Sequence, residues 1–173
     1  MKTNKTKNIA AAGIFAAAIM AMTMIHLPIP SETGYVHLGD GLIYLAASFL
    51  PGPYAVAAAA IGGALADLIS GYFHWVPFTF VIKALNTVPF IIYFKYAKKN
   101  PDKALTPYTV ILSAISGIIT VLLYFLSTWI IYGNIAPAVA ELPGSAVQAI
   151  GSSVFYGFVG AALNKSKIKF NRR

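Results

Sequence analysis

The sequence predicts an all-α integral membrane bundle of six transmembrane helices, and three observations carry this prediction. Apolar residues make up 58% of the 173 residues and charged residues 10%. The mean hydropathy is +0.70, far above that of an ordinary soluble domain. The apolar residues form runs of roughly 17–25 residues, the length that crosses a bilayer as a helix. We therefore expect a single membrane domain that covers residues 1–173.

The expected spans follow the uncharged runs of the sequence. The second run is short, so its helix must be tilted or must enter the membrane with a polar end that protein covers. Pro89 should bend the fourth span, since proline cannot donate the helical hydrogen bond. The six spans are expected at about residues 9–25, 38–50, 54–71, 76–97, 108–132 and 146–163.

The orientation of the chain follows from its lysines and arginines. Three lysines precede the first span, four lie in the last turn of the fourth or follow it, and five basic residues follow the sixth, so every basic residue except Lys83 falls on one side. The positive-inside rule makes that side cytoplasmic and places both termini there. The net charge of +8 therefore reflects topology and gives no support to nucleic-acid binding.

The first span is rich in small residues at helical spacing. Such ridges allow close helix–helix approach in lipid. One interpretation is packing inside the bundle, and the other is a docking face for another membrane protein. The two ridges are Gly13, Ala17 and Ala21, and Ala12 with Ala16.

The densest polar cluster is the segment Gly34–Asp40, at the start of the second span. Ionisable groups at membrane depth usually face a cavity, a pathway or a ligand. His37 and Asp40 are three residues apart, so on a helix they would share a face. The alternative is that Asp40 caps the helix, as aspartate often does, and that His37 lies in a solvated loop.

Lys83 interrupts the fourth predicted span, far from its ends, and it shares a helical face with Thr79, Asn86 and Thr87. Buried charges usually have a partner. Asp67 on the antiparallel third span is expected at a similar depth, so a Lys83–Asp67 ion pair is an alternative to a direct ligand role for Lys83. The fifth and sixth spans carry further polar stripes at helical spacing, namely Ser113, Gly117, Thr120, Tyr124 and Ser127, and Gln148, Ser152, Tyr156 and Gly160.

Several chemistries find no support in the sequence. There is no cysteine, so disulfides, thiolate catalysis and cysteine-bound metals are excluded. The chain has no P-loop for ATP, no H-E-x-x-H and no G-x-S-x-G elbow. Three scattered histidines include no close pair that would indicate a metal site. We expect no cofactor and no metal.

Three sequence segments together carry a resemblance to a known family. They are Gly34–Asp40, the string Ala64-Leu65-Ala66-Asp67-Leu68 that ends the third span, and Trp75 to Lys83 at the start of the fourth. With the alanine-rich first span, they resemble the substrate-binding S components of energy-coupling factor (ECF) vitamin transporters over nearly the whole chain. The similarity is greatest to the branch assigned to hydroxymethylpyrimidine, a thiamine precursor, or to pyridoxine.

The resemblance implies a non-enzymatic uptake subunit in the bacterial plasma membrane. Such a subunit captures a vitamin from outside and docks through its first span on a transmembrane coupling subunit, which two cytoplasmic ATPases drive. Gly13 stands where the family's alanine motif suggests alanine, so the docking register is either Gly13/Ala17 or Ala12/Ala16.

We expect the vitamin in the outer half of the membrane, beneath a lid formed by residues 26–39. Tyr35, His37 and Asp40 would recognise it and Trp75 would stack on its ring. The residues expected at its polar edge are Lys83, Asn86 and Gln148. The alternatives are a stand-alone proton- or sodium-coupled carrier and, less favoured, a membrane enzyme with Asp40 and Asp67 as paired acids.

Overall fold

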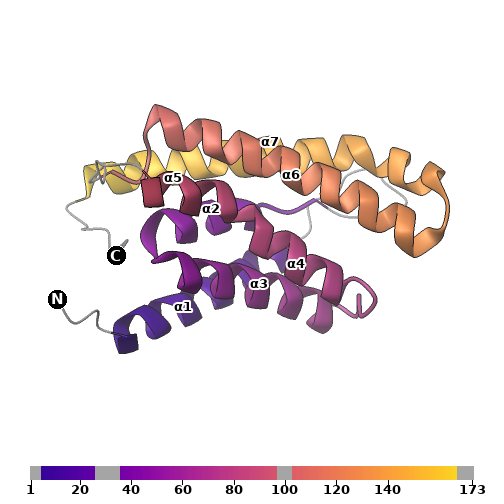
Figure 1. The fold of residues 1–173 in the computed structure, drawn as a ribbon, viewed down its shortest axis with the longest axis horizontal. Coiled ribbons are helices and arrows are strands. Elements are labelled where there is room, and N and C mark those ends of the chain that lie inside the picture. Colours follow the sequence, from indigo (N-terminus) through magenta and orange to yellow (C-terminus); the bar gives the residue numbers. More distant parts are fainter. Residues whose placement is uncertain (1–4, 26–35, 97–102, 167–173) are drawn as a thin grey trace.

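The computed structural model describes residues 5–25, 36–96 and 103–166, and every regular element in these ranges is a helix. Figure 1 shows the helices packed as one elongated bundle. Five of them, with α4 and α5 counted as one, are long and apolar enough to cross a membrane. The described part of the chain is therefore that of a multi-pass membrane protein. The helices are α1 (Lys5–Met24), α2 (Gly39–Phe49), α3 (Gly52–Ile69), α4 (Val76–Asn86), α5 (Val88–Tyr96), α6 (Pro107–Tyr132) and α7 (Ile135–Lys165).

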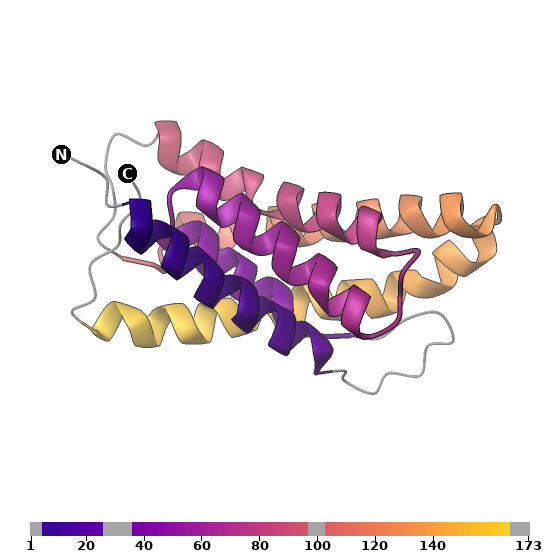
Figure 2. The same cartoon turned by 90° about the horizontal axis from the view of Figure 1, so that it is seen from below.

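The bundle has two distinct ends. The first turn of α1 and the last turn of α7 lie at one end, which we call the terminal end (Figures 1 and 2). The α3–α4 and α6–α7 turns lie at the other, which we call the hairpin end, and the α6–α7 hairpin projects furthest there. The beginning and the end of the described chain thus share one side, as the six-span prediction requires. The number of spans and their orientation in the membrane remain predictions.

The second helix is short, and the chain that leads into it is covered by protein. α2 has 11 residues, and Val36 and His37, which precede it, are each only 4% exposed. This arrangement is the second of the two expected from the sequence: irregular backbone at membrane depth is tolerated where protein covers it. Because α2 begins only at Gly39, His37 and Asp40 do not share a helical face, contrary to the sequence interpretation.

The fourth predicted span is interrupted where proline suggested a bend. α4 ends at Asn86 and α5 begins at Val88, so the break falls at Thr87, two residues before Pro89. Proline has no N–H to donate to the preceding turn, so the helical hydrogen bonding is interrupted next to it. The helix is therefore broken beside Pro89, and the angle of the predicted bend stays a prediction.

The last helix begins much earlier than the sequence indicated. α7 starts at Ile135 rather than near residue 146, and it contains Pro143. Asn134 supplies its cap, accepting a hydrogen bond from the Ala136 N–H at 2.9 Å. Glu141, expected in a loop, lies inside this helix and accepts a hydrogen bond from the Thr128 hydroxyl of α6. The remaining helix bounds differ from the predicted spans by a few residues.

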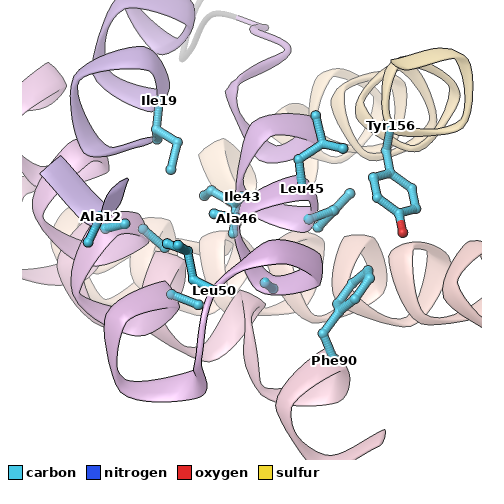
Figure 3. Packing of buried hydrophobic residues seen from close by; sticks show 13 residues of the cluster. Ala12, Ile19, Ile43, Leu45, Ala46, Leu50, Phe90 and Tyr156 are labelled. Carbon is cyan, nitrogen blue, oxygen red and sulfur yellow. The ribbon is translucent and has the colours of Figure 1, made fainter. Parts of the chain in front are cut away.

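The interior of the bundle is built largely from small and polar residues, while large apolar side chains cover its surface. Alanines of α2 and α3 pack with Ile19, Ile43 and Phe90 in the buried cluster drawn in Figure 3. Large apolar side chains such as Ile14, Ile118 and Phe158 are more than half exposed. The buried polar residues include most of the predicted stripes of α4, α6 and α7. This inversion suits a lipid environment, where helices associate through small residues and hydrogen bonds.

Candidate functional site

An ion pair buried between α2 and α4 is the centre of the candidate site. Lys83 Nζ donates a hydrogen bond to Asp40 Oδ1 at 2.6 Å, and both side chains are 0% exposed. Lys83 lies seven residues after the start of α4, roughly 10 Å along the helix from the hairpin end. Burying two charges is costly unless their geometry is good and their remaining valences are satisfied. A pair retained at this depth is therefore a strong indication of function.

The pair is completed by a residue from the far end of the sequence. The Gln148 amide of α7 donates to Asp40 Oδ2 at 3.0 Å, so both carboxylate oxygens have a partner. α2, α4 and α7 thus converge on one carboxylate. Asp40 makes no side-chain cap for α2, and the alternative that it merely caps the helix finds no support in this geometry.

The sequence interpretation offered Asp67 as the partner of Lys83, and the structure gives Asp40 instead. Asp67 is buried near the end of α3, yet the carboxylate hydrogen-bonded to Lys83 is that of Asp40. The packing fits this pairing: Gly63 of α3 lies directly against the stem of Lys83, and an ideal Cβ there would be 2.6 Å from Lys83 Cγ. The ammonium therefore extends past α3 to α2.

Aromatic side chains flank the ion pair on its hairpin side. Lys83 Nζ lies 5.1 Å from the centre of the Tyr124 ring, within cation–π range. The ring centres of Tyr124 and the half-buried Trp75 are 5.8 Å apart, and the Tyr124 hydroxyl lies 3.4 Å from the Thr79 hydroxyl. Trp75, Tyr124 and Lys83 thus form a continuous series from the start of α4 to the ion pair.

His37 and Asn86 lie next to the pair without joining it. The Gly39 N–H donates to His37 Nδ1 at 3.1 Å, which fixes the imidazole at the start of α2, within electrostatic reach of Asp40. Asn86 is fully buried about one helical turn beyond Lys83, toward the terminal end. Tyr35 and most of the predicted lid lie outside the described residues.

The sequence-predicted residues therefore divide into two sets. Asp40, Lys83 and Gln148 are in direct contact, and the other described candidates, His37, Trp75 and Asn86, surround them. The sequence analysis did not include Tyr124 among the site residues, although the polar stripe of the fifth span contained it. Its helical spacing from the other polar residues of that stripe could have indicated that it faces the interior. Within the described residues no group of three histidine or acidic side chains could hold a metal.

The first helix presents its two small-residue ridges to different surroundings. Ala12 is buried, and the Ala16 carbonyl packs on Gly62 of α3. Gly13, Ala17 and Ala21 are exposed, and nothing lies within 4 Å of the position that a Cβ on Gly13 would occupy. The Ala12/Ala16 ridge is therefore used for packing inside the bundle, and the Gly13/Ala17/Ala21 ridge faces outward.

Comparison with known proteins agrees with this architecture. A protein of Pyrococcus woesei named "Uncharacterized protein in gap 3'region" is 34% identical over 149 residues, which cover 86% of this chain and 95% of that protein. Residues 3–165 match the family described as "ECF-type riboflavin transporter, S component". That match covers all seven helices, so the chain belongs to the ECF-type transporter S component family and is a membrane subunit of a vitamin transporter.

Proposed function

We propose that this S component captures a small, flat, nitrogen-containing vitamin from the outer side of the membrane at the Asp40–Lys83–Gln148 site. The observation that carries the proposal is the ion pair at 2.6 Å, fully buried at membrane depth and completed by Gln148. The proposed substrate is hydroxymethylpyrimidine or pyridoxine. The hairpin end of the bundle is then the outer side.

The chemistry of the three side chains suits such rings. A carboxylate accepts hydrogen bonds, an ammonium donates them, and an amide does both. The exocyclic amine of an aminopyrimidine can donate to Asp40 while its ring nitrogen accepts from Lys83 or Gln148. For pyridoxine, the phenolic oxygen and the ring nitrogen can take the same two roles. In each case the bound vitamin would take over hydrogen bonds that Asp40 makes with Lys83 and Gln148 when no ligand is present.

The balance of charge further restricts the substrate. One ammonium and one carboxylate leave the ion pair neutral, and the His37 imidazole is the other basic side chain close to it among the described residues. A phosphate ester would bring about −1.5 to −2 charges into this buried site, more than a single imidazole can offset. We therefore expect the free vitamin to bind and its phosphate ester to be rejected. Riboflavin, for which the family is named, has a larger ring system with similar polar edges.

The remaining candidate residues have supporting roles in this proposal. Trp75 and Tyr124 provide aromatic surface beside Lys83, on which a ring can stack. Tyr35 and His37 contribute from the entrance, and residues 26–39 act as the lid. Asn86, expected from the sequence at the polar edge of the vitamin, lies about one helical turn beyond Lys83 and would therefore be deeper than the ring.

The proposal includes docking through the exposed face of α1. The outward position of Gly13, Ala17 and Ala21 supports the Gly13/Ala17 register, because the other ridge is occupied by α3. The partner would be a transmembrane coupling subunit powered by two cytoplasmic ATPases. The absence of a P-loop from this chain is consistent with separate ATPases.

The direct test is to identify and measure the ligand. Mass spectrometry of the purified protein should detect the retained vitamin, and calorimetric titration should compare hydroxymethylpyrimidine, pyridoxine and riboflavin with the phosphate esters of the first two. Asp40→Asn and Gln148→Leu should each weaken binding about 5- to 150-fold, because a buried polar group loses its partner. Wild-type affinity in both variants would exclude this site.

Copurification separates the proposed function from its alternatives. An S component expressed with its coupling subunit and ATPases should be recovered in one complex with them. A stand-alone ion-coupled carrier or a membrane enzyme should take up or convert its substrate without those subunits, and uptake by the isolated chain in vesicles would favour such a function.

A further inference from the structure

A second set of polar side chains lies one helical turn beyond the ion pair, toward the terminal end. It comprises Tyr44, Asn86, Ser116 and Ser152, which we call the deep layer. Tyr44 follows Asp40 by four residues, Asn86 follows Lys83 by three, and Ser152 follows Gln148 by four. Four helices, α2, α4, α6 and α7, therefore each contribute one polar residue at this level.

Close contacts hold α2 and α6 against the part of α7 that carries Ser152. An ideal Cβ on Gly41, three residues before Tyr44, would lie 2.8 Å from the Ser152 carbonyl oxygen. An ideal Cβ on Gly117, next to Ser116, would lie 3.0 Å from the Cβ of Ala149, three residues before Ser152. The Tyr44 hydroxyl lies near the Asn86 amide, and their geometry is not that of a hydrogen bond.

The deep layer is fully buried, yet its polar atoms are unsatisfied within the described protein. The Tyr44 hydroxyl, both amide atoms of Asn86 and the hydroxyls of Ser116 and Ser152 have no hydrogen-bond partner among the described residues. Buried polar groups are nearly always hydrogen-bonded, to protein or to a bound molecule. Neighbouring serines and threonines show the usual solution: Ser113 donates to the Val110 carbonyl and Thr120 to the Ser116 carbonyl.

An aromatic cluster closes the layer on its terminal side. The rings of Tyr44, Phe90 and Tyr156 contact one another with centres 5.7 to 6.0 Å apart. Figure 3 shows Phe90 and Tyr156 approaching each other from α5 and α7. The Tyr156 hydroxyl donates to the Ala104 carbonyl at 2.8 Å and contacts Ser48 at 3.0 Å, which fixes this cluster in place. By helix register, the deep layer therefore lies between the ion pair and this aromatic cluster.

We propose that the deep layer is a binding site for a hydroxyl group that both donates and accepts hydrogen bonds. Its source is the hydroxymethyl arm of the vitamin, which water replaces when no vitamin is bound. All four side chains are neutral, and together they offer hydroxyl and amide groups of both polarities. These neutral side chains suit a hydroxyl better than a charged group. A charged group would instead be recognised by the ion pair, which lies toward the hairpin end.

This inference rests on the proposed function and adds a second point of recognition to it. The charged residues would hold the polar edge of the ring, and the deep layer would hold its arm. The two levels are one helical turn apart, about 5 Å, which matches an arm that extends beyond a ring edge. Both hydroxymethylpyrimidine and pyridoxine carry such an arm.

The test compares each vitamin with an analogue that lacks one hydroxyl. The pairs are hydroxymethylpyrimidine with 4-amino-2,5-dimethylpyrimidine, and pyridoxine with 4-deoxypyridoxine. Wild-type protein should prefer the hydroxylated member of its cognate pair about 5- to 150-fold. Tyr44→Phe, which retains the ring, and Ser152→Ala should each lower that preference toward one. Ser113→Ala is the matched control, because Ser113 already bonds its own helix, and it should retain the wild-type preference.

The outcomes distinguish the inference from the function on which it rests. If wild-type protein binds both members of a pair equally, the vitamin binds but its arm does not reach the deep layer, and the inference is wrong while the function stands. If both variants retain the full preference, the hydroxyl is recognised elsewhere and the inference is again wrong. If wild-type protein binds none of the four compounds, the proposed substrate itself is wrong.

Discussion

Lys83 on α4 and Asp40 on α2 form an ion pair of 2.6 Å in the interior of the bundle, and neither side chain is exposed. The two residues are 43 positions apart in sequence, and the pair joins the short second helix to the fourth. Because Gln148 bonds the second carboxylate oxygen, the network also holds α7. The same three groups that would recognise a ligand therefore hold three helices together when none is bound.

The first prediction concerns the partner of Lys83. Lys83→Met should lower the free energy of unfolding by about 3–5 kcal/mol, because the Asp40 carboxylate is left buried without its cation. Adding Asp40→Asn should restore much of that loss, whereas adding Asp67→Asn should not. Denaturant unfolding in detergent measures the three variants. Rescue by Asp67→Asn instead would mean that Lys83 neutralises the acid of α3.

The second prediction concerns the contact between α1 and α3. A Cβ on Gly62 would lie 2.6 Å from the Ala16 carbonyl oxygen and 3.0 Å from Ile19 Cβ, and a backbone atom cannot move aside cheaply. Gly62→Ala should therefore destabilise the protein by about 1–3 kcal/mol. Gly157→Ala, on α7, is the control, since nothing lies within 4 Å of its Cβ position. Thermal unfolding should separate the two variants, and equal midpoints would contradict this packing.

Much of the fold could be predicted because lipid imposes a simple pattern. Uncharged runs located α1, α3 and α6 to within a few residues, and Pro89 indicated the break between α4 and α5. The extension of α7 to Ile135 could not be seen, because Glu141 and Pro143 are typical of a loop in sequence. The structure accommodates them in a helix that projects at the hairpin end, where Thr128 of α6 bonds Glu141.

The candidate site was predictable in its residues but not in its pairing. Asp40, Lys83 and Gln148 were recognisable as polar groups at membrane depth. The expected depth pointed to Asp67 as the partner of Lys83, and nothing in the sequence indicated that Asp40 would take its place. Gly63 lets the Lys83 stem pass against α3, and such a tertiary contact cannot be read from the spacing of residues in the sequence.

The third prediction concerns topology, and the absence of cysteine makes it easy to test. A single cysteine at Ser166, an exposed residue after α7, should resist membrane-impermeant thiol reagents in intact cells. A cysteine at His74, exposed in the α3–α4 turn, should be labelled. The reason is that the basic residues near Ser166 mark the cytoplasmic side. Labelling of the Ser166 site from outside, with a protected His74 site, would invert the proposed orientation.

The last prediction concerns docking by α1. Ala17→Phe adds bulk to an exposed ridge of small residues, and close helix approach in lipid depends on such residues. Copurification with the coupling subunit should therefore fall sharply, while vitamin affinity stays near that of wild type, because the candidate site is built from α2, α4, α6 and α7. Ala161→Phe, which adds the same bulk to an exposed position of α7, is the matched control and should preserve the complex. Ala12→Phe should instead lower the thermal stability of the isolated protein, since Ala12 is buried. A complex that tolerates Ala17→Phe but is lost with Ala161→Phe would move the docking surface from α1 to α7.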